Sequence, residues 1–132
     1  HEPRSFGVGL DLAALEAEIA AVRPALAFNL VESLAGHGRL IAVVPQLLDA
    51  LGIPYAGCPA QAIHATSGKL LAKERLETAG LPTPAWLTAR DLAQGAGALV
   101  FPETWIVKSV WEHASVGLDE DSVRSFASAE EL

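Results

Sequence analysis

The sequence predicts an α/β fold, in which an open layer of parallel strands and helices is followed by the start of a separate α+β piece. Helical and extended patterns alternate through the first half of the chain, as helix, strand, helix, short strand and helix. Hydrophobic residues make up 51% of the 132 residues and charged residues 19%, a composition that can form a packed core. Because the pattern then changes, we expect two parts, residues 1–66 and residues 67–132.

The first expected helix covers Asp11 to Val22. Asp11 is a suitable N-cap, and apolar residues then recur at helical spacing, at Leu12, Leu15, Ile19 and Val22. Pro24 ends this helix, because the residue before a proline avoids the helical conformation. The nearly continuous apolar run from Ala25 to Val31 predicts a strand that is buried on both faces, as in a parallel sheet.

A second amphipathic helix is expected over Leu40 to Leu51, where apolar residues again recur at helical spacing. Pro45 lies inside this range and predicts either a kink or a helix start close to it. A short extended piece over Ile53 to Gly57 and one or two helical turns over Pro59 to His64 complete the first part.

The second part contains shorter elements. We expect first a helix over Gly68 to Ala79, then a strand over Pro84 to Thr88 and a short helix or loop over Ala89 to Gly97. A strand over Thr104 to Ser109, a loop over Trp111 to Gly117 and a turn over Leu118 to Ser122 follow. A capping box at Ser128 to Glu131 then predicts the start of a further helix.

Three features predict that these residues are a portion of a longer protein. The chain contains no methionine and begins at His1. The strand expected before the first helix is missing or reduced to Phe6 to Leu10. The capping box opens a helix immediately before the last residue, Leu132.

The charge and cysteine content exclude several classes of protein. The formal net charge is −7, so we expect neither a nucleic-acid partner nor an anionic membrane surface as a partner. No apolar run approaches the roughly 18 residues that a membrane helix requires. The one cysteine, Cys58, excludes an internal disulfide and a cysteine-based metal cluster.

The most informative chemistry lies at Lys108 and the loop that follows it. A lysine on a buried strand requires an anionic partner, and a loop of small residues can cradle phosphate oxygens with its backbone amides. Together they suit a nucleoside triphosphate, and His113 in the loop could assist an anion when protonated. The alternative is an edge-strand lysine that opposes aggregation, followed by an ordinary hairpin loop.

Three more residues are candidates. Lys69 stands in the first turn of its helix, where it opposes the helix dipole, so a ligand is one explanation and pairing with helix neighbours is the other. Glu32 follows a predicted parallel strand at its carboxyl end, where open α/β sheets bind ligands, although it could equally be a loop acid. His37, between two glycines, could donate to a substrate or be solvated.

A series of motifs occurs in one order along the chain. They are Phe28-Asn-Leu-Val-Glu32, Gly36-His-Gly-Arg-Leu40, Val44-Pro-Gln-Leu-Leu48, Leu51-Gly-Ile-Pro-Tyr-Ala-Gly57, Thr66-Ser-Gly-Lys69, Ala79-Gly-Leu-Pro82 and Ile106-Val-Lys108 with Glu112-His-Ala-Ser-Val-Gly117. This ordered set, over roughly residues 25 to 120, resembles the D-alanine–D-alanine ligase family of ATP-grasp enzymes.

The resemblance implies a Rossmann-like, pre-ATP-grasp layer followed by the start of an ATP-grasp subdomain. It implies a cytoplasmic ligase of peptidoglycan precursor synthesis that uses ATP and Mg²⁺ to join small amino acids through an acyl phosphate, with the metal ligands outside these residues. By resemblance, Lys69 and Lys108 are the nucleotide lysines. The lid over the phosphates is Glu112, His113, Ala114, Ser115, Val116 and Gly117, with Ser115 the catalytic candidate, and Glu32 and His37 lie on the substrate side.

The sequence also departs from the family pattern. Gly68-Lys69 replaces Asp-Lys, Val107-Lys-Ser109 replaces Val-Lys-Pro, and His113-Ala114 replaces a Gly-Ser pair. The resemblance also implies that the family's adenine-binding hinge, its acidic magnesium ligands and its substrate-carboxylate arginine lie outside these residues. For that reason we expect the 132-residue chain to be catalytically inactive, and whether it is an enzyme by itself stays open. The alternative function is a non-catalytic α/β module that acts by protein–protein association. A cut ligase should expose a sheet edge and an apolar face, which a homodimer could cover.

Overall fold

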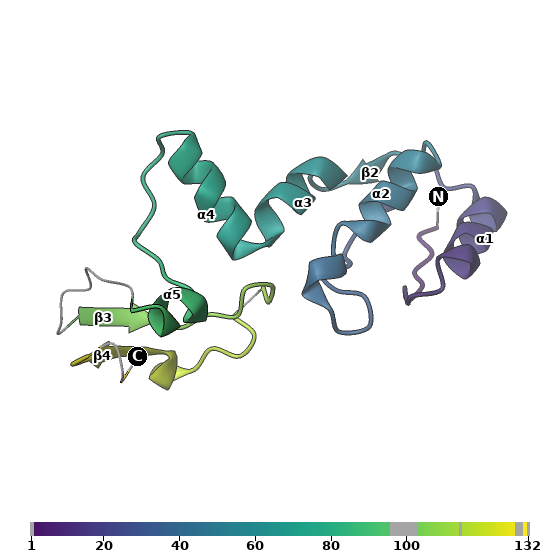
Figure 1. Cartoon of the computed structure of the whole chain (residues 1–132). Coiled ribbons are helices and arrows are strands. Elements are labelled where there is room, and N and C mark those ends of the chain that lie inside the picture. The colour runs from purple at the N-terminus through teal and green to yellow at the C-terminus, as the bar shows by residue number, and fades with distance from the viewer. Residues whose placement is uncertain (1, 96–102, 114, 129–130, 132) are drawn as a thin grey trace. The chain divides into compact units, whose positions relative to one another are not determined.

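The structure is a computed structural model that describes residues 2–95, 103–113, 115–128 and 131. The chain forms two compact units, His1–Ala72 and Lys73–Leu132, which are described separately (Figure 1). The division between the units falls inside the helix Lys69–Thr78. It lies close to the boundary expected between residues 66 and 67, and that expected boundary stays a prediction.

Helix α1 (Leu12–Val22) begins where the sequence predicts. Its N-cap is Asp11, whose carboxylate accepts a hydrogen bond from the Ala14 amide at 3.0 Å. The helix ends at Arg23, which adopts the left-handed conformation with φ 47° and donates its amide to the Ile19 carbonyl. A left-handed residue closes a helix in this way because it turns the chain out of the helical path.

The predicted strand over Ala25 to Val31 is much shorter in the structure. Strand β1 covers only Ala27–Phe28 and pairs in parallel with β2 (Tyr55–Ala56). The expectation of burial on both faces is wrong, because Phe28 is 74% exposed. Within the described residues β1 has one neighbouring strand, and only one face of the run packs against the core, through Ala27 and Val31. Whether this parallel pair belongs to a Rossmann-like layer stays a prediction.

The second predicted helix begins late, as Pro45 allows. A 3₁₀ turn, η1 (Gly38–Leu40), precedes α2 (Val43–Ala50), in which Pro45 occupies the first turn. Proline is tolerated there because the amide that it lacks would have no partner within the helix. Helix α3 (Ala60–Ser67) follows β2 and extends the turns predicted over residues 59–64.

The amino-terminal unit has a small apolar core between α1 and α2. Its buried members come from both helices and from the loop after β1, and they are Leu15, Ile19, Leu34, Val44 and Leu48. Half-buried apolar residues of β1, β2 and the adjoining loops pack around this cluster. The helical periodicity read from the sequence therefore identifies the side chains that hold this unit together.

The carboxy-terminal unit contains most of α4 (Lys69–Thr78), α5 (Ala89–Ala93) and an antiparallel pair of strands. Strand β3 (Glu103–Ile106) pairs with β4 (Val123–Phe126), and a 3₁₀ turn, η2 (Glu120–Ser122), leads into β4. In this register Trp105 lies opposite Arg124, and Glu103 lies opposite Phe126. Among the described residues, no helix is long and apolar enough to cross a membrane.

The strand predicted over residues 84–88 is absent, and side chains of α4 hold this segment instead. Lys73 Nζ donates to Thr83 Oγ1 at 3.0 Å and to the Pro84 carbonyl at 2.8 Å. Trp86 Nε1 donates to Glu77 Oε1 at 2.8 Å. Because Lys73 and Glu77 are four residues apart, they lie on one face of α4 and fix the segment without strand pairing.

The capping box predicted at Ser128 to Glu131 includes residues 129 and 130, which lie outside the described residues. The Glu131 carboxylate accepts a hydrogen bond from the Ala127 amide at 2.6 Å. The further helix that this motif predicts therefore stays a prediction.

Candidate functional site

The predicted phosphate loop is the connection between β3 and β4. Pairing continues one residue past β3, since the Val107 amide donates to the Ser122 carbonyl at 3.0 Å. The predicted lid residues 112–117 thus lie within a loop whose two ends are held together by antiparallel strands. Ala114 is part of the predicted lid but lies outside the described residues.

Two consecutive turns shape the described part of this loop. The Val116 amide donates to the His113 carbonyl at 3.1 Å, and the Leu118 amide donates to the Ser115 carbonyl at 3.0 Å. Ser115 and Gly117 occupy the third position of these turns, with φ of 63° and 74°. Positive φ at this position favours glycine, so Ser115 holds a conformation that costs about 1 kcal/mol relative to glycine. In this conformation the amides of Val116 and Leu118 are engaged within the loop.

Lys108 is exposed and lies beyond the end of β3, at the entry to the loop. The premise that it is a buried strand lysine is therefore wrong. The strand ends at Ile106, so the chain around Lys108 has left the covered face of the hairpin. An exposed lysine needs no internal anionic partner, and its ammonium is available to a dissolved anion.

His113 brings an unused polar atom into the loop. The side chain is half-buried, and its Nε2 atom is buried without a hydrogen-bond partner. Trp105 Nε1 on β3 is the other buried side-chain nitrogen without a partner among the described residues. Buried polar groups normally have partners, so each atom is a candidate donor to a bound ligand. The sequence identified His113 by its place in the loop and did not single out Trp105.

The other predicted site residues lie in the amino-terminal unit. Lys69 is the first residue of α4 and is half-buried. Glu32 and His37 are both exposed, in the chain that follows β1. His37 closes a tight turn with Leu34, whose central residues Ala35 and Gly36 have φ of 49° and 75°. Lys69, Glu32 and His37 thus belong to one unit, whereas Lys108 and the loop belong to the other.

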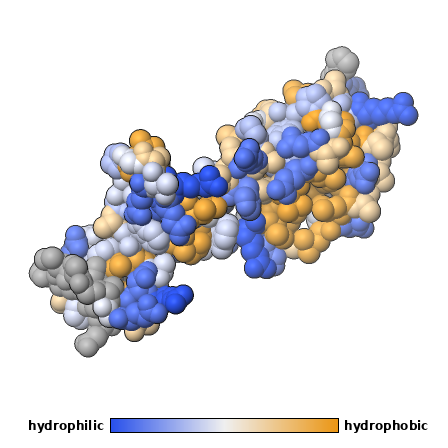
Figure 2. All heavy atoms as spheres, turned by 45° about the horizontal axis from the view of Figure 1, so that its top comes forward, coloured by the Kyte–Doolittle hydropathy of each residue, from blue (hydrophilic) through white to orange (hydrophobic). Residues whose placement is uncertain are grey.

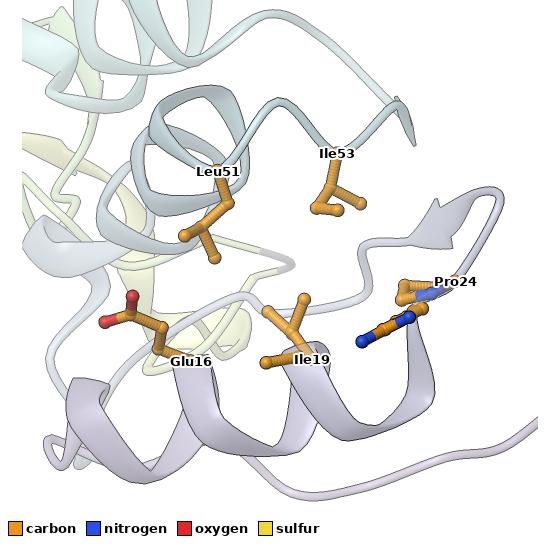
Figure 3. A pocket seen from close by; sticks show the side chains of 7 residues that line it. Glu16, Ile19, Pro24, Leu51 and Ile53 are labelled. Carbon is orange, nitrogen blue, oxygen red and sulfur yellow. The ribbon is translucent and has the colours of Figure 1, made fainter.

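The amino-terminal unit has a pocket that the sequence did not predict. It has a volume of about 290 Å³ and lies between α1 and the chain after α2. Ile19, Leu51 and Ile53 point toward one another across it, and Glu16 lies beside them (Figure 3). None of the predicted site residues lines this pocket.

One carboxylate of the carboxy-terminal unit has an altered pKa. The Thr88 hydroxyl, followed by the Thr88 amide, hydrogen-bonds to Asp91 and lowers the pKa of its carboxyl below the ordinary value. Together they form a capping box at the start of α5. The Thr-x-x-Asp spacing could have revealed this cap in the sequence. Its role is structural, because it satisfies the amides at the start of this helix.

No group of three or more His, Cys, Asp or Glu side chains that could hold a metal ion occurs among the described residues. The free thiol, Cys58, is exposed.

Comparison with known proteins gives two similar sequences. The chain is 32% identical over 93 residues to an uncharacterized protein, y4sG, of Sinorhizobium fredii (strain NBRC 101917 / NGR234). The matched region covers 70% of this chain and 27% of that protein. The chain is also 34% identical over 112 residues to a D-alanine–D-alanine ligase of Synechococcus sp. (strain JA-2-3B'a(2-13)). This match covers 76% of this chain and 32% of the ligase. The chain thus spans about a third or less of the length of these relatives.

No family model matches the chain, and no solved structure matches it. The similarity to the ligase supports the resemblance read from the motifs in part, at low identity and over part of the length.

Proposed function

We propose that these residues are part of an ATP-dependent carboxylate–amine ligase resembling D-alanine–D-alanine ligase, and that Lys108 and the loop 112–117 contact the triphosphate of ATP. The observation that carries this proposal is the loop itself. It is closed by antiparallel strands, an exposed lysine stands at its entry, and a buried imidazole nitrogen within it lacks a partner. The partial similarity to a D-alanine–D-alanine ligase supports the same reaction class.

The proposed role of each residue follows from the negative charge that phosphoryl transfer places on oxygen atoms. In such a ligase the γ-phosphoryl group moves to the carboxylate of a first amino acid, and the amine of a second then displaces phosphate from the acyl phosphate. Negative charge accumulates on the transferring oxygens, where cations and fixed donors stabilise it most. Lys108 would supply a cation, and Ser115 and His113 would supply donors. Lys69 is proposed as the second nucleotide lysine, and Glu32 and His37 as residues on the side of the amino-acid substrates.

The fit to Mg²⁺ is incomplete in these residues. Magnesium prefers carboxylate oxygens together with phosphate oxygens, and the described residues present no cluster of three acidic, histidine or cysteine ligands. We therefore expect the metal ligands outside these residues and derive no step through the metal. A cytoplasmic location, where ATP is available, belongs to the same proposal.

Calorimetric titration of the 132-residue chain with ATP tests this proposal. We expect weak binding, with a Kd on the order of 1 mM, since one loop and two lysines supply few contacts. Replacing Lys108 with alanine removes a charge-assisted contact and should weaken binding about tenfold. The matched control is Arg75→Ala, which removes one exposed positive charge from α4 and should change the Kd less than about twofold. Equal effects of the two variants, or no binding of ATP, would contradict the proposal.

Turnover gives a second test. We expect no ATP hydrolysis or dipeptide formation when the 132-residue chain is incubated with ATP, Mg²⁺ and D-alanine, because we expect the metal ligands outside these residues. Product formation that Lys108→Ala abolishes would show that the chain is sufficient for catalysis, and our expectation of inactivity would be wrong.

A second candidate function is a non-catalytic module that acts by association with a protein. Exposed apolar side chains in β1 and just after it favour this function, with Phe28 74% exposed and Leu30 77% exposed. ATP binding that depends on Lys108 would argue for the ligase, whereas association without ATP binding would argue for the module.

A further inference from the structure

The pocket beside α1 has one wall that carries a regular pattern of charge. Three residues of α1 and the residue that caps its end form this wall, at the i, i+3, i+4 and i+7 positions that share one face of a helix, namely Glu16, Ile19, Ala20 and Arg23. Ile19 belongs to the buried core, whereas Glu16 and Arg23 are exposed. The wall is therefore apolar in its middle, negative at one end and positive at the other.

The opposite wall is apolar. Leu51 and Ile53, in the chain at the end of α2, point toward Ile19 across the pocket (Figure 3). Both walls lie within the described residues of the amino-terminal unit. Apolar side chains gather over much of this unit (Figure 2), so an apolar wall alone does not mark a site. The two end charges distinguish this pocket, because small-molecule sites combine apolar walls with a few polar groups that fix the orientation of the ligand.

Neither end charge is neutralised within the described residues. In that part of the chain, the Glu16 carboxylate and the Arg23 guanidinium form no hydrogen bond or ion pair. The α1 residues three and four positions from each of them are apolar, so neither has a helical neighbour of opposite charge. Both groups are thus available to a ligand in the pocket.

The backbone at Arg23 supports the same conclusion. Arg23 closes α1 with a φ of 47°. Glycine is the usual residue in this conformation, because a side chain at positive φ meets a steric penalty. Strained residues cluster where a side chain has a function, and here the strained residue lines the pocket.

The pattern on the α1 wall specifies the ligand. A zwitterion that is apolar between its charged ends would meet an opposite charge at each end and apolar side chains between them. Glu16 and Arg23 are seven residues apart, which is about 10 Å along a helix axis. The two charged groups of a free amino acid share one carbon atom, whereas an extended dipeptide spans about 7 Å, which leaves a gap that the two long side chains can close. The pocket volume of about 290 Å³ suits a ligand of this size.

We propose that this pocket binds a dipeptide with free ends and an aliphatic side chain. Its ammonium group contacts Glu16, and its carboxylate contacts Arg23, whose guanidinium can bind a carboxylate through two parallel hydrogen bonds. Its aliphatic side chain lies among Ile19, Leu51 and Ile53. This inference is independent of the proposed ligase function, since it uses no residue of the candidate phosphate site.

Calorimetric titration of the 132-residue chain with alanyl-leucine tests the proposal. We expect a Kd on the order of 1 mM, because the pocket supplies few contacts. Glu16→Gln and Arg23→Gln should each weaken binding about fivefold, because each removes one charge-assisted contact. The matched control is Glu18→Gln, at an exposed position of α1 that does not line the pocket, and it should change the Kd less than about twofold. No binding of alanyl-leucine, or equal effects of the three variants, would overturn the proposal.

Blocked peptides test the contact assigned to each end. N-acetyl-alanyl-leucine has no ammonium group, so it should bind the wild type about fivefold more weakly and should be insensitive to Glu16→Gln. Alanyl-leucine amide has no carboxylate and should likewise be insensitive to Arg23→Gln. Free leucine, whose two charges share one carbon atom, should bind more weakly than alanyl-leucine. Equal affinities for leucine and alanyl-leucine, or an acetylated peptide that still responds to Glu16→Gln, would overturn the proposal.

Discussion

Two phenylalanines on two short sheets have opposite environments. Phe28 on β1 is 74% exposed, whereas Phe126 on β4 is 1% exposed. Phe126 shares its face of the hairpin with Trp105 and Arg124, and the Arg124 guanidinium lies 4.8 Å from the centre of its ring. The carboxy-terminal unit thus covers its own aromatic residue, while the amino-terminal unit leaves one open. An apolar strand sequence therefore does not by itself show that the strand is buried.

The largest effect expected from this comparison is the loss of stability in Phe126→Ala. Removing a fully buried phenylalanine lowers the free energy of unfolding by about 3–5 kcal/mol. The control, Phe28→Ala, should change it by less than about 0.5 kcal/mol, because its side chain is exposed. Urea unfolding followed by circular dichroism measures both. Similar losses in the two variants would show that the two environments do not differ as described.

The comparison also shows what the sequence could predict. Helical periodicity predicted α1, α2 and their core residues, because packing against a nearby helix leaves a regular apolar stripe. The same reasoning failed for Ala25 to Val31 and for Pro84 to Thr88. In the first segment, Phe28 and Leu30 are left exposed by the described residues, and in the second Lys73 and Glu77 replace strand pairing. Neither event leaves a signal in the local sequence.

The candidate site was predicted in part. Small residues and glycine between two extended segments predicted a loop over Trp111 to Gly117, and the described residues of this loop form consecutive turns. The exposure of Lys108 could not be predicted, because it depends on β3 ending at Ile106. The unpartnered Trp105 nitrogen depends on strand register and has no local signal either.

A smaller effect is expected when the attachment of residues 83–84 to α4 is removed. Lys73→Ala loses the hydrogen bonds to Thr83 and Pro84 and should lower the free energy of unfolding by about 1–2 kcal/mol. Amide hydrogen exchange should become faster over residues 83–88. Arg75→Ala on the same helix is the control, and unchanged exchange in Lys73→Ala would contradict the account of this segment.

The strained backbone of Ser115 predicts a substitution that raises the free energy of unfolding instead of lowering it. Ser115→Gly should raise the free energy of unfolding by about 1 kcal/mol, because glycine adopts positive φ without a steric penalty. Ser115→Ala removes the same hydroxyl but keeps the strain, so thermal unfolding of the two variants separates the two contributions. A destabilised Ser115→Gly would show that the hydroxyl contributes more than the strain.

The smallest effect is the pH dependence of the α5 cap. The pKa of Asp91 is lowered in the folded chain by the Thr88 hydrogen bonds. The resulting stabilisation is present above the ordinary aspartate pKa of about 4 and is lost as pH falls through the lower folded value. Thr88→Ala should lower the free energy of unfolding more at neutral pH than at low pH, because the protonated Asp91 carboxyl no longer accepts these hydrogen bonds as a carboxylate. Thermal unfolding at pH 7 and pH 2 measures this difference. An equal loss of stability at the two pH values would contradict this assignment.

The central claim is that the β3–β4 loop contacts the triphosphate of ATP. The most direct measurement is a nuclear magnetic resonance titration of the isotope-labelled 132-residue chain with ATP, with adenosine as the control ligand. We predict that the amide signals of Lys108 and residues 112–117 shift with ATP and not with adenosine, and that Lys108→Ala greatly reduces these shifts. Unchanged loop signals at millimolar ATP, or equal shifts with adenosine, would contradict the claim.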